Sequence, residues 1–446
     1  MRTLIVGAGE VGWYLAGRLA REGHEVVVLD RDRDLLLRRS RQGADVRMER
    51  AEATSPRALA EHRAGEVDLF VAVTTSDADN LLACLLAREL GARRTIARVR
   101  DAGYYEPGAD IAVGTLGIDM LVSPELTAVG DLESALRVRG AVRVEQFADD
   151  RLAIAQCKVP EGSPAARRTV VTRPHQTKSK IGALLRDGRV HLVTRDSVPM
   201  PGDQVVVAAP REQLKDACRE IDPDARQVHR VGIFGAGRIG TALAARLARR
   251  GREVIVLEPD EARARDAAEE LEDSSIEVLW DEGASETAMR EAGIDTCDAF
   301  VSCAGDDRTT LLACTHADRL DIGLVLAVLS REEFAPLGEG LGVDGTVSPR
   351  LAAAERILRT ARGTGARKSA LLTDGLEALE YGITATSRLH DRPVAASLPH
   401  GTSLFAIVRD GEVRFPGDVE RYRAGDSLLV LARGSHATDL AGVLGD

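Results

Sequence analysis

Leu4-Ile-Val-Gly-Ala-Gly-Glu-Val-Gly12 is the stretch of sequence that decides the fold. Three apolar residues lead into glycines with the spacing G-x-G-x-x-G, and a helical pattern of apolar residues follows. In such a strand–turn–helix unit, Gly7 permits the tight turn, Gly9 lets the backbone approach a pyrophosphate, and Gly12 lets helix and strand pack closely. The stretch therefore predicts a dinucleotide-binding turn formed by Gly7, Ala8, Gly9, Glu10, Val11 and Gly12.

An acidic residue at the end of the next strand supports this interpretation. The strand Glu25-Val-Val-Val-Leu-Asp30 places Asp30 23 residues after Gly7, about where a carboxylate bonds the ribose hydroxyls of adenosine. A glycine-rich turn without a ligand is the alternative explanation of the glycines alone. The acid at this distance favours a nucleotide site, with Asp30 and the adjacent Arg31 as candidate contacts.

A polar loop after a second buried strand is expected to complete the site. The run Asp68-Leu-Phe-Val-Ala-Val-Thr-Thr75 is almost continuously apolar, as expected of a strand buried on both faces. Ligands of open α/β sheets bind beyond the carboxyl ends of the strands, so the loop that follows should face the glycine turn. Its candidate contacts are Thr74, Thr75, Asp77 and Asn80.

The same glycine turn occurs a second time in the chain. Val231-Gly-Ile-Phe-Gly-Ala-Gly-Arg-Ile-Gly240 repeats it 228 positions later, and Glu258 follows Gly235 by the same 23 residues. An internal repeat of this length decides the architecture. It predicts a second nucleotide site with the candidate residues Gly235, Ala236, Gly237, Arg238, Ile239, Gly240 and Glu258.

The first 137 residues alternate between short apolar strands and amphipathic helices. Strands are expected near 2–6, 25–29, 45–48, 68–73, 95–99 and 119–122, and helices near 11–22, 32–41, 56–63, 77–90 and 124–137. A βαβ series of this kind forms a mostly parallel sheet with right-handed crossovers. The sequence therefore predicts a Rossmann-like, doubly wound α/β domain.

Residues 138–212 change character and read as a small α+β domain. The short β-like segments are Arg151–Val159, Ile181–Leu185, Val190–Thr194 and Gln204–Ala208, and a helix is expected over 211–220. The basic stretch over 167–180 is either an anion site or a solvated loop, and composition favours the loop.

Further echoes extend the repeat over the whole chain. Val347-Ser-Pro-Arg-Leu matches Val122-Ser-Pro-Glu-Leu, and Gly425-Asp-Ser-Leu-Leu-Val430 matches Gly202-Asp-Gln-Val-Val-Val207. The fold class predicted is thus α/β, with two tandem Rossmann-like parallel-sheet domains, each followed by a small α+β domain. The expected boundaries are 1–137 and 228–362 for the Rossmann-like domains, and 138–221 and 366–446 for the small ones.

Composition limits the possible partners and compartments. A net charge of −11 disfavours nucleic acid, and no run of about 18 apolar residues is long enough to span a membrane. The six scattered cysteines contain no C-x-x-C pair, which argues against a zinc site and for a reducing compartment. No signal peptide is visible, so we expect a cytoplasmic protein.

Together these motifs resemble the nucleotide-binding regulatory subunits of Trk-type potassium uptake systems, which carry tandem RCK (KTN) domains. The matching marks are Gly-Ala-Gly-Glu-Val-Gly12, Asp30, Val71-Ala-Val-Thr-Thr-Ser-Asp77 with Asn80, and Ile96-Ala-Arg-Val99. The resemblance covers essentially the whole chain. It implies that the residues matching Gly7 to Val11, Asp30, Thr74, Thr75 and Arg98 contact NAD or NADH.

The resemblance also implies partners. Such subunits form a ring of eight nucleotide domains under a membrane potassium channel, so we expect a homo-oligomer, most simply a tetramer. It would lie peripherally on the inner face of the cell membrane through its transporter partner. The sequence leaves open whether that partner is a channel or an antiporter, and which nucleotide activates.

The second half departs from the pattern of these subunits. Arg238 stands where Glu10 stood, the loop after the fourth strand is Ser302-Cys-Ala-Gly-Asp-Asp-Arg308, and Leu326-Ala-Val-Leu329 has no arginine matching Arg98. We therefore expect a weaker or different second site, which takes ATP, ADP or AMP or stays empty.

An enzyme is the alternative function, in the form of a duplicated NAD-dependent oxidoreductase. It would need a proton donor or a metal beside the nicotinamide and a separate substrate domain. The nine histidines form no pair at ligand spacing, and Cys303 reads as a small apolar residue at a strand end. We predict no catalytic residue, no metal site and a regulatory function.

Overall fold

The structure is a computed structural model of the 446-residue chain. It describes all residues apart from 22, 42, 44, 106–116, 171–176, 187–188, 226, 282, 362–365, 374, 395–397, 434–435, 437–439 and 441–446. The chain divides into two compact units. The first is Met1–Thr127 with Pro349–Arg362, and the second is Ala128–Ser348 with Gly363–Asp446.

The first unit is built on a parallel sheet of six strands in the order β3-β2-β1-β4-β5-β6. The strands are β1 Arg2–Val6, β2 Glu25–Asp30, β3 Arg47–Arg50, β4 Leu69–Ala72, β5 Thr95–Arg98 and β6 Met120–Val122. Its helices are α1 Glu10–Arg21, α2 Arg33–Ser40, α3 Pro56–Glu61 and α4 Asp77–Leu90, with short 3-10 turns at Ala64–Glu66 and Ala102–Tyr105. Helix α5 (Pro124–Arg137) follows β6, and only its first residues, up to Thr127, belong to this unit. Every residue of β4 is buried, as the apolar run predicted.

Local signals fix the ends of α4, which carries the polar loop of the first half. Ser76 caps its N-terminus, with the side-chain oxygen accepting a hydrogen bond from the Asp79 N–H at 3.2 Å. Gly91 ends the helix in the left-handed region, with φ at 114°. A serine N-cap and a glycine C-cap satisfy backbone groups that helix ends leave unpaired.

The second unit contains the repeated parallel sheet, in the order β14-β13-β12-β15-β16-β17. Its strands are β12 Arg230–Phe234, β13 Glu253–Glu258, β14 Ile276–Trp280, β15 Ala299–Ser302, β16 Val325–Val328 and β17 Gly345–Val347. Its helices are α7 Arg238–Ala248, α8 Glu261–Glu270, α9 Glu286–Glu291, α10 Asp307–Arg319 and α11 Ala335–Glu339, with 3-10 turns at Ile294–Thr296 and Glu332–Phe334. The strand order repeats that of the first sheet, so the two halves share one topology.

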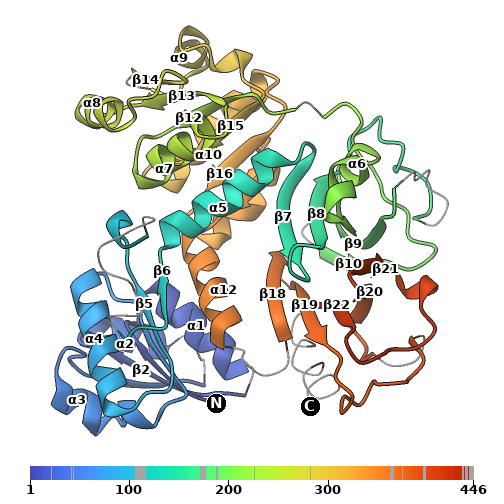
Figure 1. The fold of residues 1–446 in the computed structure, drawn as a ribbon. Coiled ribbons are helices and arrows are strands. Elements are labelled where there is room, and N and C mark those ends of the chain that lie inside the picture. Colours follow the sequence, from blue (N-terminus) through green and yellow to red (C-terminus); the bar gives the residue numbers. More distant parts are fainter. Residues whose placement is uncertain are drawn as a thin grey trace. The chain divides into compact units, whose positions relative to one another are not determined.

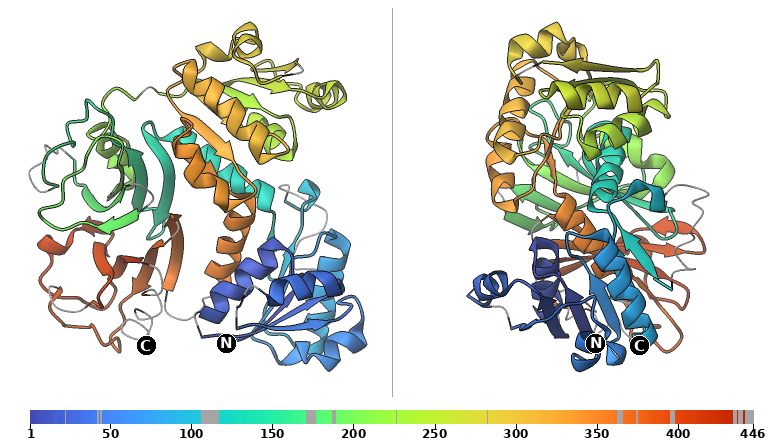
Figure 2. Two further views of the ribbon diagram at one scale, coloured as in Figure 1. Left: turned by 180° about the vertical axis from the view of Figure 1, so that it is seen from behind. Right: turned by 90° about the vertical axis from the view of Figure 1, so that its left-hand side faces the viewer.

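Two antiparallel five-stranded sheets complete the second unit, in the orders β10-β9-β11-β8-β7 and β18-β19-β22-β20-β21 (green and red, Figure 2). The first contains β7 Ala141–Phe147, β8 Leu152–Lys158, β9 Lys180–Arg186, β10 Arg189–Leu192 and β11 Gln204–Pro210, followed by the turn Arg211–Gln213 and α6 Leu214–Arg219. The second contains β18 Ala366–Thr373, β19 Leu376–Gly382, β20 Thr402–Arg409, β21 Glu412–Arg414 and β22 Ser427–Arg433, with a 3-10 turn at Pro416–Asp418. One apolar core joins the two sheets and includes Phe147, Val206, Phe405 and Leu431.

Two helices pack against the parallel sheet of the other repeat rather than against the sheet of the repeat to which they belong in sequence. Helix α12 (Pro349–Ala361) follows β17 in sequence, yet its residues Ala353, Ile357 and Leu358 lie in the core of the first sheet, beside α1 (Figure 1). Helix α5 follows β6, yet Leu132 and Leu136 lie in the core of the second parallel sheet. Each parallel sheet is therefore covered partly by a helix from the other repeat.

The fold class matches the sequence-based prediction, with small differences. Strand β7 lies outside the predicted segments, because its burial does not alternate in a simple pattern along Ala141–Phe147. Strand β3 begins at Arg47 rather than near residue 45. Part of the basic stretch over 167–180, residues 171–176, lies outside the described residues. The four domain boundaries stay predictions.

Candidate functional site

The first glycine turn has one open position between two crowded ones. Gly7 has φ at +104°, and a Cβ there would lie 3.0 Å from the Val73 carbonyl carbon. A Cβ on Gly12 would lie 1.9 Å from the Gly7 oxygen, so only glycine allows this contact of helix and strand. A Cβ on Gly9 would meet nothing within 4 Å. Gly9 therefore faces open space at the start of α1, where a phosphate can approach the backbone.

Asp30 is placed against this turn. Its Oδ2 accepts a hydrogen bond from the Ala8 N–H at 2.7 Å, and its Oδ1 accepts one from the Asp32 N–H at 2.9 Å. The residue is half-buried, and an ionised carboxylate can accept about four hydrogen bonds. Asp30 can therefore hold the glycine turn and still accept ribose hydroxyls. Arg31 beside it is exposed, and Val11 is buried in α1.

The Thr74–Asn80 loop is held in one conformation by the amide of Asn80. Asn80 Oδ1 accepts hydrogen bonds from the Thr74 N–H at 2.8 Å and the Thr74 hydroxyl at 2.7 Å. Asn80 Nδ2 donates to the carbonyl oxygens of Thr74 at 3.2 Å and Arg98 at 2.9 Å. These hydrogen bonds link the residues at the ends of β4 and β5. Asn80 itself is fully buried.

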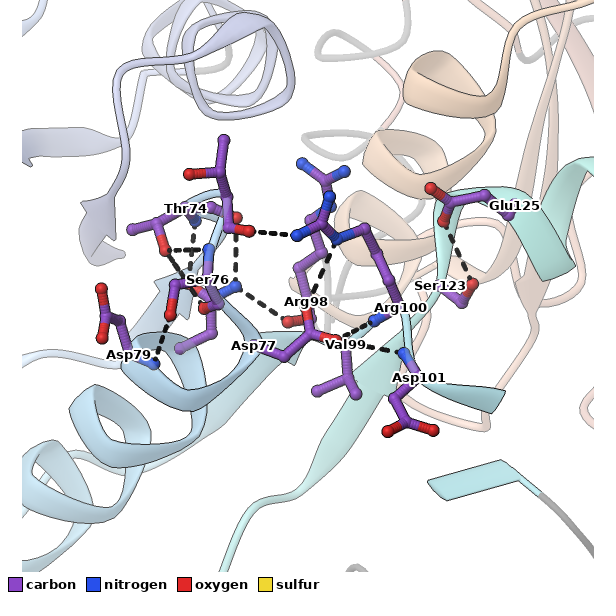
Figure 3. Close-up of polar contacts among 12 residues, drawn as sticks. Thr74, Ser76, Asp77, Asp79, Arg98, Val99, Arg100, Asp101, Ser123 and Glu125 are labelled. Carbon is purple, nitrogen blue, oxygen red and sulfur yellow. Dashed lines mark hydrogen bonds and ion pairs between the residues drawn. The ribbon is translucent and has the colours of Figure 1, made fainter. Parts of the chain in front are cut away.

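A second tie joins the start of α4 to the segment after β5. Asp77 Oδ2 accepts hydrogen bonds from the backbone N–H groups of Arg100 at 2.8 Å and Asp101 at 3.1 Å. The Arg100 guanidinium pairs with Asp77 Oδ1 at 3.5 Å and donates to the Thr75 carbonyl (Figure 3). Arg98, at the end of β5, lies beside it. Sequence reasoning selected Arg98 and missed Arg100.

Two further arginines reach the glycine turn from other helices. Arg39 of α2 donates from Nε to the Ala8 carbonyl at 3.2 Å. Arg350, the second residue of α12, forms an ion pair with Glu10. Burial lowers the pKa of both arginines from the usual 12.5. The sequence gives no local signal for either contact, since each crosses to another helix.

The second glycine turn repeats the geometry of the first. Gly235 has φ at +103°, and a Cβ on Gly240 would lie 1.9 Å from the Gly235 oxygen. A Cβ on Gly237 would meet nothing within 4 Å. Ala236 is buried, Ile239 packs on the core, and Arg238 is exposed at the start of α7. A phosphate can therefore approach this turn as well.

Glu258 differs from Asp30 in its surroundings. Its Oε2 accepts from the Ala236 N–H at 2.6 Å, and its Oε1 accepts from the Asp260 N–H at 2.9 Å. The guanidinium of Arg263 also donates to Oε1, from Nη2 at 2.8 Å. Glu258 is only 2% exposed, so its carboxylate is buried and already hydrogen-bonded, whereas Asp30 is half-buried.

The loop after β15 lacks the amide network of the first half. Asp307 still accepts from the backbone N–H groups of Ser330 at 2.7 Å and Arg331 at 3.1 Å, as Asp77 does in the first half. Thr310 stands in place of Asn80, and its buried hydroxyl has no hydrogen-bond partner among the described residues. Val328 stands in place of Arg98 and is buried. The second half therefore lacks the polar side chains that Asn80 and Arg98 place at this edge of the first sheet.

Two cysteines of the second half, Cys297 and Cys303, have thiols with raised pKa values. Burial raises the pKa of the Cys303 thiol to about 12, and it raises the pKa of Cys297 to about 12 as well. A thiol with so high a pKa is almost entirely protonated at neutral pH. Within the part of the chain that the structure describes, no cluster of three or more metal-ligating side chains occurs. Nor is any helix among those residues long and apolar enough to cross a bilayer.

Comparison with known proteins identifies the family. The sequence profile of the TrkA-N domain matches residues 3–124 and 231–349, which contain both glycine turns. The chain belongs to the TrkA-N domain family. This TrkA-N protein thus carries the domain twice, as the sequence repeat predicted.

Several relatives of this TrkA-N protein are similar over nearly its whole length. The Trk system potassium uptake protein TrkA of Vibrio alginolyticus is 28% identical over 428 residues, covering 94% of this chain and 93% of the relative. That of Azorhizobium caulinodans is 29% identical, covering 97% and 96%. The TrkA homolog of Archaeoglobus fulgidus is 27% identical, covering 97% of each.

Solved structures confirm the fold of this TrkA-N protein. The GsuK RCK domain matches with a TM-score of 0.62 and 21% identity, covering 99% of this chain and 94% of the other. The GsuK channel bound to NAD matches with the same TM-score and 20% identity, covering 99% and 78%. The predicted tandem of Rossmann-like domains with small companion domains is therefore confirmed.

Proposed function

We propose that this chain is a nucleotide-binding regulatory subunit of a Trk-type potassium transport system. The observation that carries the proposal is the open position at Gly9. Asp30, at the end of β2, lies on one side of it in the strand order, and Arg98, at the end of β5, lies on the other. Family membership and the names of the full-length relatives support potassium transport as the process. No catalytic residue is part of the proposal.

The ligand proposed for the first site is NAD or NADH. A pyrophosphate at the Gly7–Gly12 turn would meet the N-terminus of α1 and the arginines around it. Asp30 would accept hydrogen bonds from the ribose, and its charge would repel a 2′-phosphate. The GsuK channel, which shares this fold, has been solved with NAD and with ADP, which supports an adenine nucleotide as the class of ligand.

The second site is proposed to be functionally different. Glu258 is already paired with Arg263. The aliphatic side chain of Val328 cannot make the ionic contact with a phosphate that is proposed for Arg98. Arg238 at the turn could reach a phosphate from the other side. These features favour a shorter ligand such as AMP, ADP or ATP, bound more weakly than the dinucleotide of the first site.

The proposed mechanism is ligand-dependent gating. A nucleotide shifts a conformational equilibrium only through different affinities for the two states. In this proposal the subunit assembles with itself, most simply as a tetramer with eight nucleotide domains, beneath a membrane potassium transporter on the cytoplasmic side. Duplicated, symmetric units suit such a ring better than they suit a single active site.

Potassium flux measured with the reconstituted transporter and the purified subunit tests the proposal. We expect NAD or NADH to change the flux with the wild-type protein and with Gly237→Asp, but not with Gly9→Asp. Each variant places an anion where a phosphate must lie, so they form a matched pair. The same samples would be followed at 340 nm with NADH. Cofactor turnover without any effect on flux would favour a duplicated oxidoreductase instead.

A further inference from the structure

The edge of the second parallel sheet is arranged in the order in which the parts of a nucleotide follow one another. The glycine turn follows β12, Glu258 ends the neighbouring strand β13, and Trp280 ends the next strand β14. Glu258 and Trp280 are direct register partners in the parallel pairing of β13 and β14. Adjacent strands lie about 5 Å apart. A nucleotide with its phosphates at the turn and its ribose at Glu258 therefore has its base over the end of β14.

Trp280 is exposed at this place. It is 51% exposed, although the chain has only two tryptophans and large aromatic side chains are ordinarily well buried. Its indole Nε1 donates a hydrogen bond to the carbonyl of Pro259 at 3.3 Å, and Pro259 directly follows Glu258. This bond holds the indole against the residue that follows Glu258 and leaves much of the ring exposed.

We propose that Trp280 stacks on the purine base of a nucleotide bound at the second site. The inference deepens the proposed function, because it assumes that the Gly235–Gly240 turn binds phosphate. An indole face offers every purine a stacking surface without a specific hydrogen bond. Trp280 is then the group that supplies affinity where Val328 has replaced the arginine of the first site.

The first half has a different residue in the same register. Arg50 ends β3 as the partner of Asp30, and its Nε donates to the Arg31 carbonyl at 3.1 Å. A guanidinium can also stack on a base, but its charge favours ligands with more phosphate. The two sites thus differ on both sides of the ribose. The first relies on cations, and the second relies on an aromatic ring.

The ligand class follows from this division. The second turn has one exposed arginine of its own, Arg238, and Arg263 lies beside the ribose position, paired with Glu258. This set suits a purine nucleoside monophosphate or diphosphate better than a dinucleotide, whose second half would extend toward Val328. ADP is the probe that combines a purine base with two phosphates.

The test uses the full-length protein in a Trp13→Phe background, so that Trp280 is the single tryptophan. ADP should change the tryptophan fluorescence saturably. Gly237→Asp should abolish this change, and Gly9→Asp should leave it in place. By calorimetry on the Gly9→Asp background, Trp280→Ala should weaken ADP binding about 5- to 100-fold, and Trp280→Phe should restore most of the affinity. Ribose 5-phosphate, which lacks the base, should bind equally with tryptophan or alanine at 280.

The outcomes separate this inference from the proposed function. ADP binding that depends on Gly237 but not on Trp280 would overturn the stacking and leave nucleotide binding at the second site intact. Absence of any binding sensitive to Gly237→Asp would overturn both the second site and the stacking. If Trp280→Ala instead changes the oligomeric state in light scattering, with unaltered ADP affinity, the indole belongs to a protein interface and the inference is wrong.

Discussion

Arg350 forms an ion pair with Glu10, which joins the start of helix α12 to the first glycine turn. The two side chains are 41% and 55% exposed. Exposed pairs of this kind contribute about 0–1 kcal/mol to the free energy of unfolding. In the repeat the charges are reversed, because Arg238 stands in place of Glu10 and Glu125 stands in place of Arg350. We therefore expect this ion pair to affect nucleotide binding more than the free energy of unfolding.

Removing Arg350 should weaken nucleotide binding at the first site. Without it, the Glu10 carboxylate stands uncompensated next to an incoming pyrophosphate. We expect Arg350→Gln to raise the Kd for NAD about 3- to 30-fold, Glu10→Gln to lower it slightly, and the double variant to lie close to wild type. Calorimetry on the four proteins measures the coupling. Independent effects of the two substitutions would show that the pair does not act on the ligand.

The glycines of the first turn should separate binding from folding. Gly9→Asp places a carboxylate in open space, so NAD binding should be lost with little change in melting temperature. Gly12→Ala puts a Cβ 1.9 Å from the Gly7 oxygen, so the protein should lose on the order of 2–4 kcal/mol of stability. Thermal unfolding and NAD titration on both variants check this. An equally destabilised Gly9→Asp would mean that the turn is closed rather than open.

Asn80 and Thr310 should respond oppositely to removal of their polar groups. Asn80→Ala removes a fully buried amide and leaves the Thr74 N–H without its bond in a half-buried place, and we expect a cost of about 1–3 kcal/mol and weaker NAD binding. Thr310→Val removes a hydroxyl that has no partner among the described residues, so stability should stay unchanged or rise. Urea unfolding gives both values. A large loss in Thr310→Val would point to a bound water or ligand at that hydroxyl.

Lys180 should make stability depend on pH. Burial lowers its pKa from 10.5 to about 8, and its Nζ donates to the Leu404 carbonyl at 3.1 Å. Below pH 8 Lys180 is protonated in both the folded and the unfolded state. The folded state then carries the full cost of burying the charged amine, roughly 3 kcal/mol. Between pH 8 and 10.5 the unfolded state binds more protons, so the stability of the wild type rises with pH.

Comparison with Lys180→Met isolates that contribution. At pH 7 the variant should have the larger free energy of unfolding, because it avoids the cost of burying a charge, although losing the hydrogen bond to Leu404 offsets part of this gain. The difference should shrink as the pH approaches 10.5. Denaturant unfolding at several pH values measures the difference. A difference that stays constant from pH 7 to 10.5 would contradict a lowered pKa.

Asp30 should set the choice among nucleotides at the first site. We expect NADH to bind more tightly than NADPH, because a 2′-phosphate would face the carboxylate. Asp30→Ala should weaken NADH binding about tenfold and narrow the gap to NADPH. Competition calorimetry decides. Unchanged affinity in the variant would mean that the acid only supports the Ala8 N–H.

Sequence patterns predicted the fold because each repeated signal acts locally. Glycine spacing, strand burial and helix periodicity depend on near neighbours, so both parallel sheets were predictable. The partners of Glu10 and Glu258 were not, although Arg263 lies only five residues from Glu258. Glu258 ends a strand and Arg263 lies in the following helix, and side chains at this spacing can lie together or apart depending on the turn between the two elements. The partner of Glu10 lies in α12, so that ion pair depends on tertiary packing that no local pattern encodes.

The helices that pack in the opposite repeat also constrain how the protein is made. Ile357 and Leu358 belong to the core of the first sheet, whose first strand is synthesised more than 350 residues earlier. The ribosome must therefore complete most of the second repeat before the first domain can close its apolar face. Such distant contacts slow folding and leave the nascent first domain open. The two parallel-sheet domains therefore cannot complete their cores one after the other during synthesis.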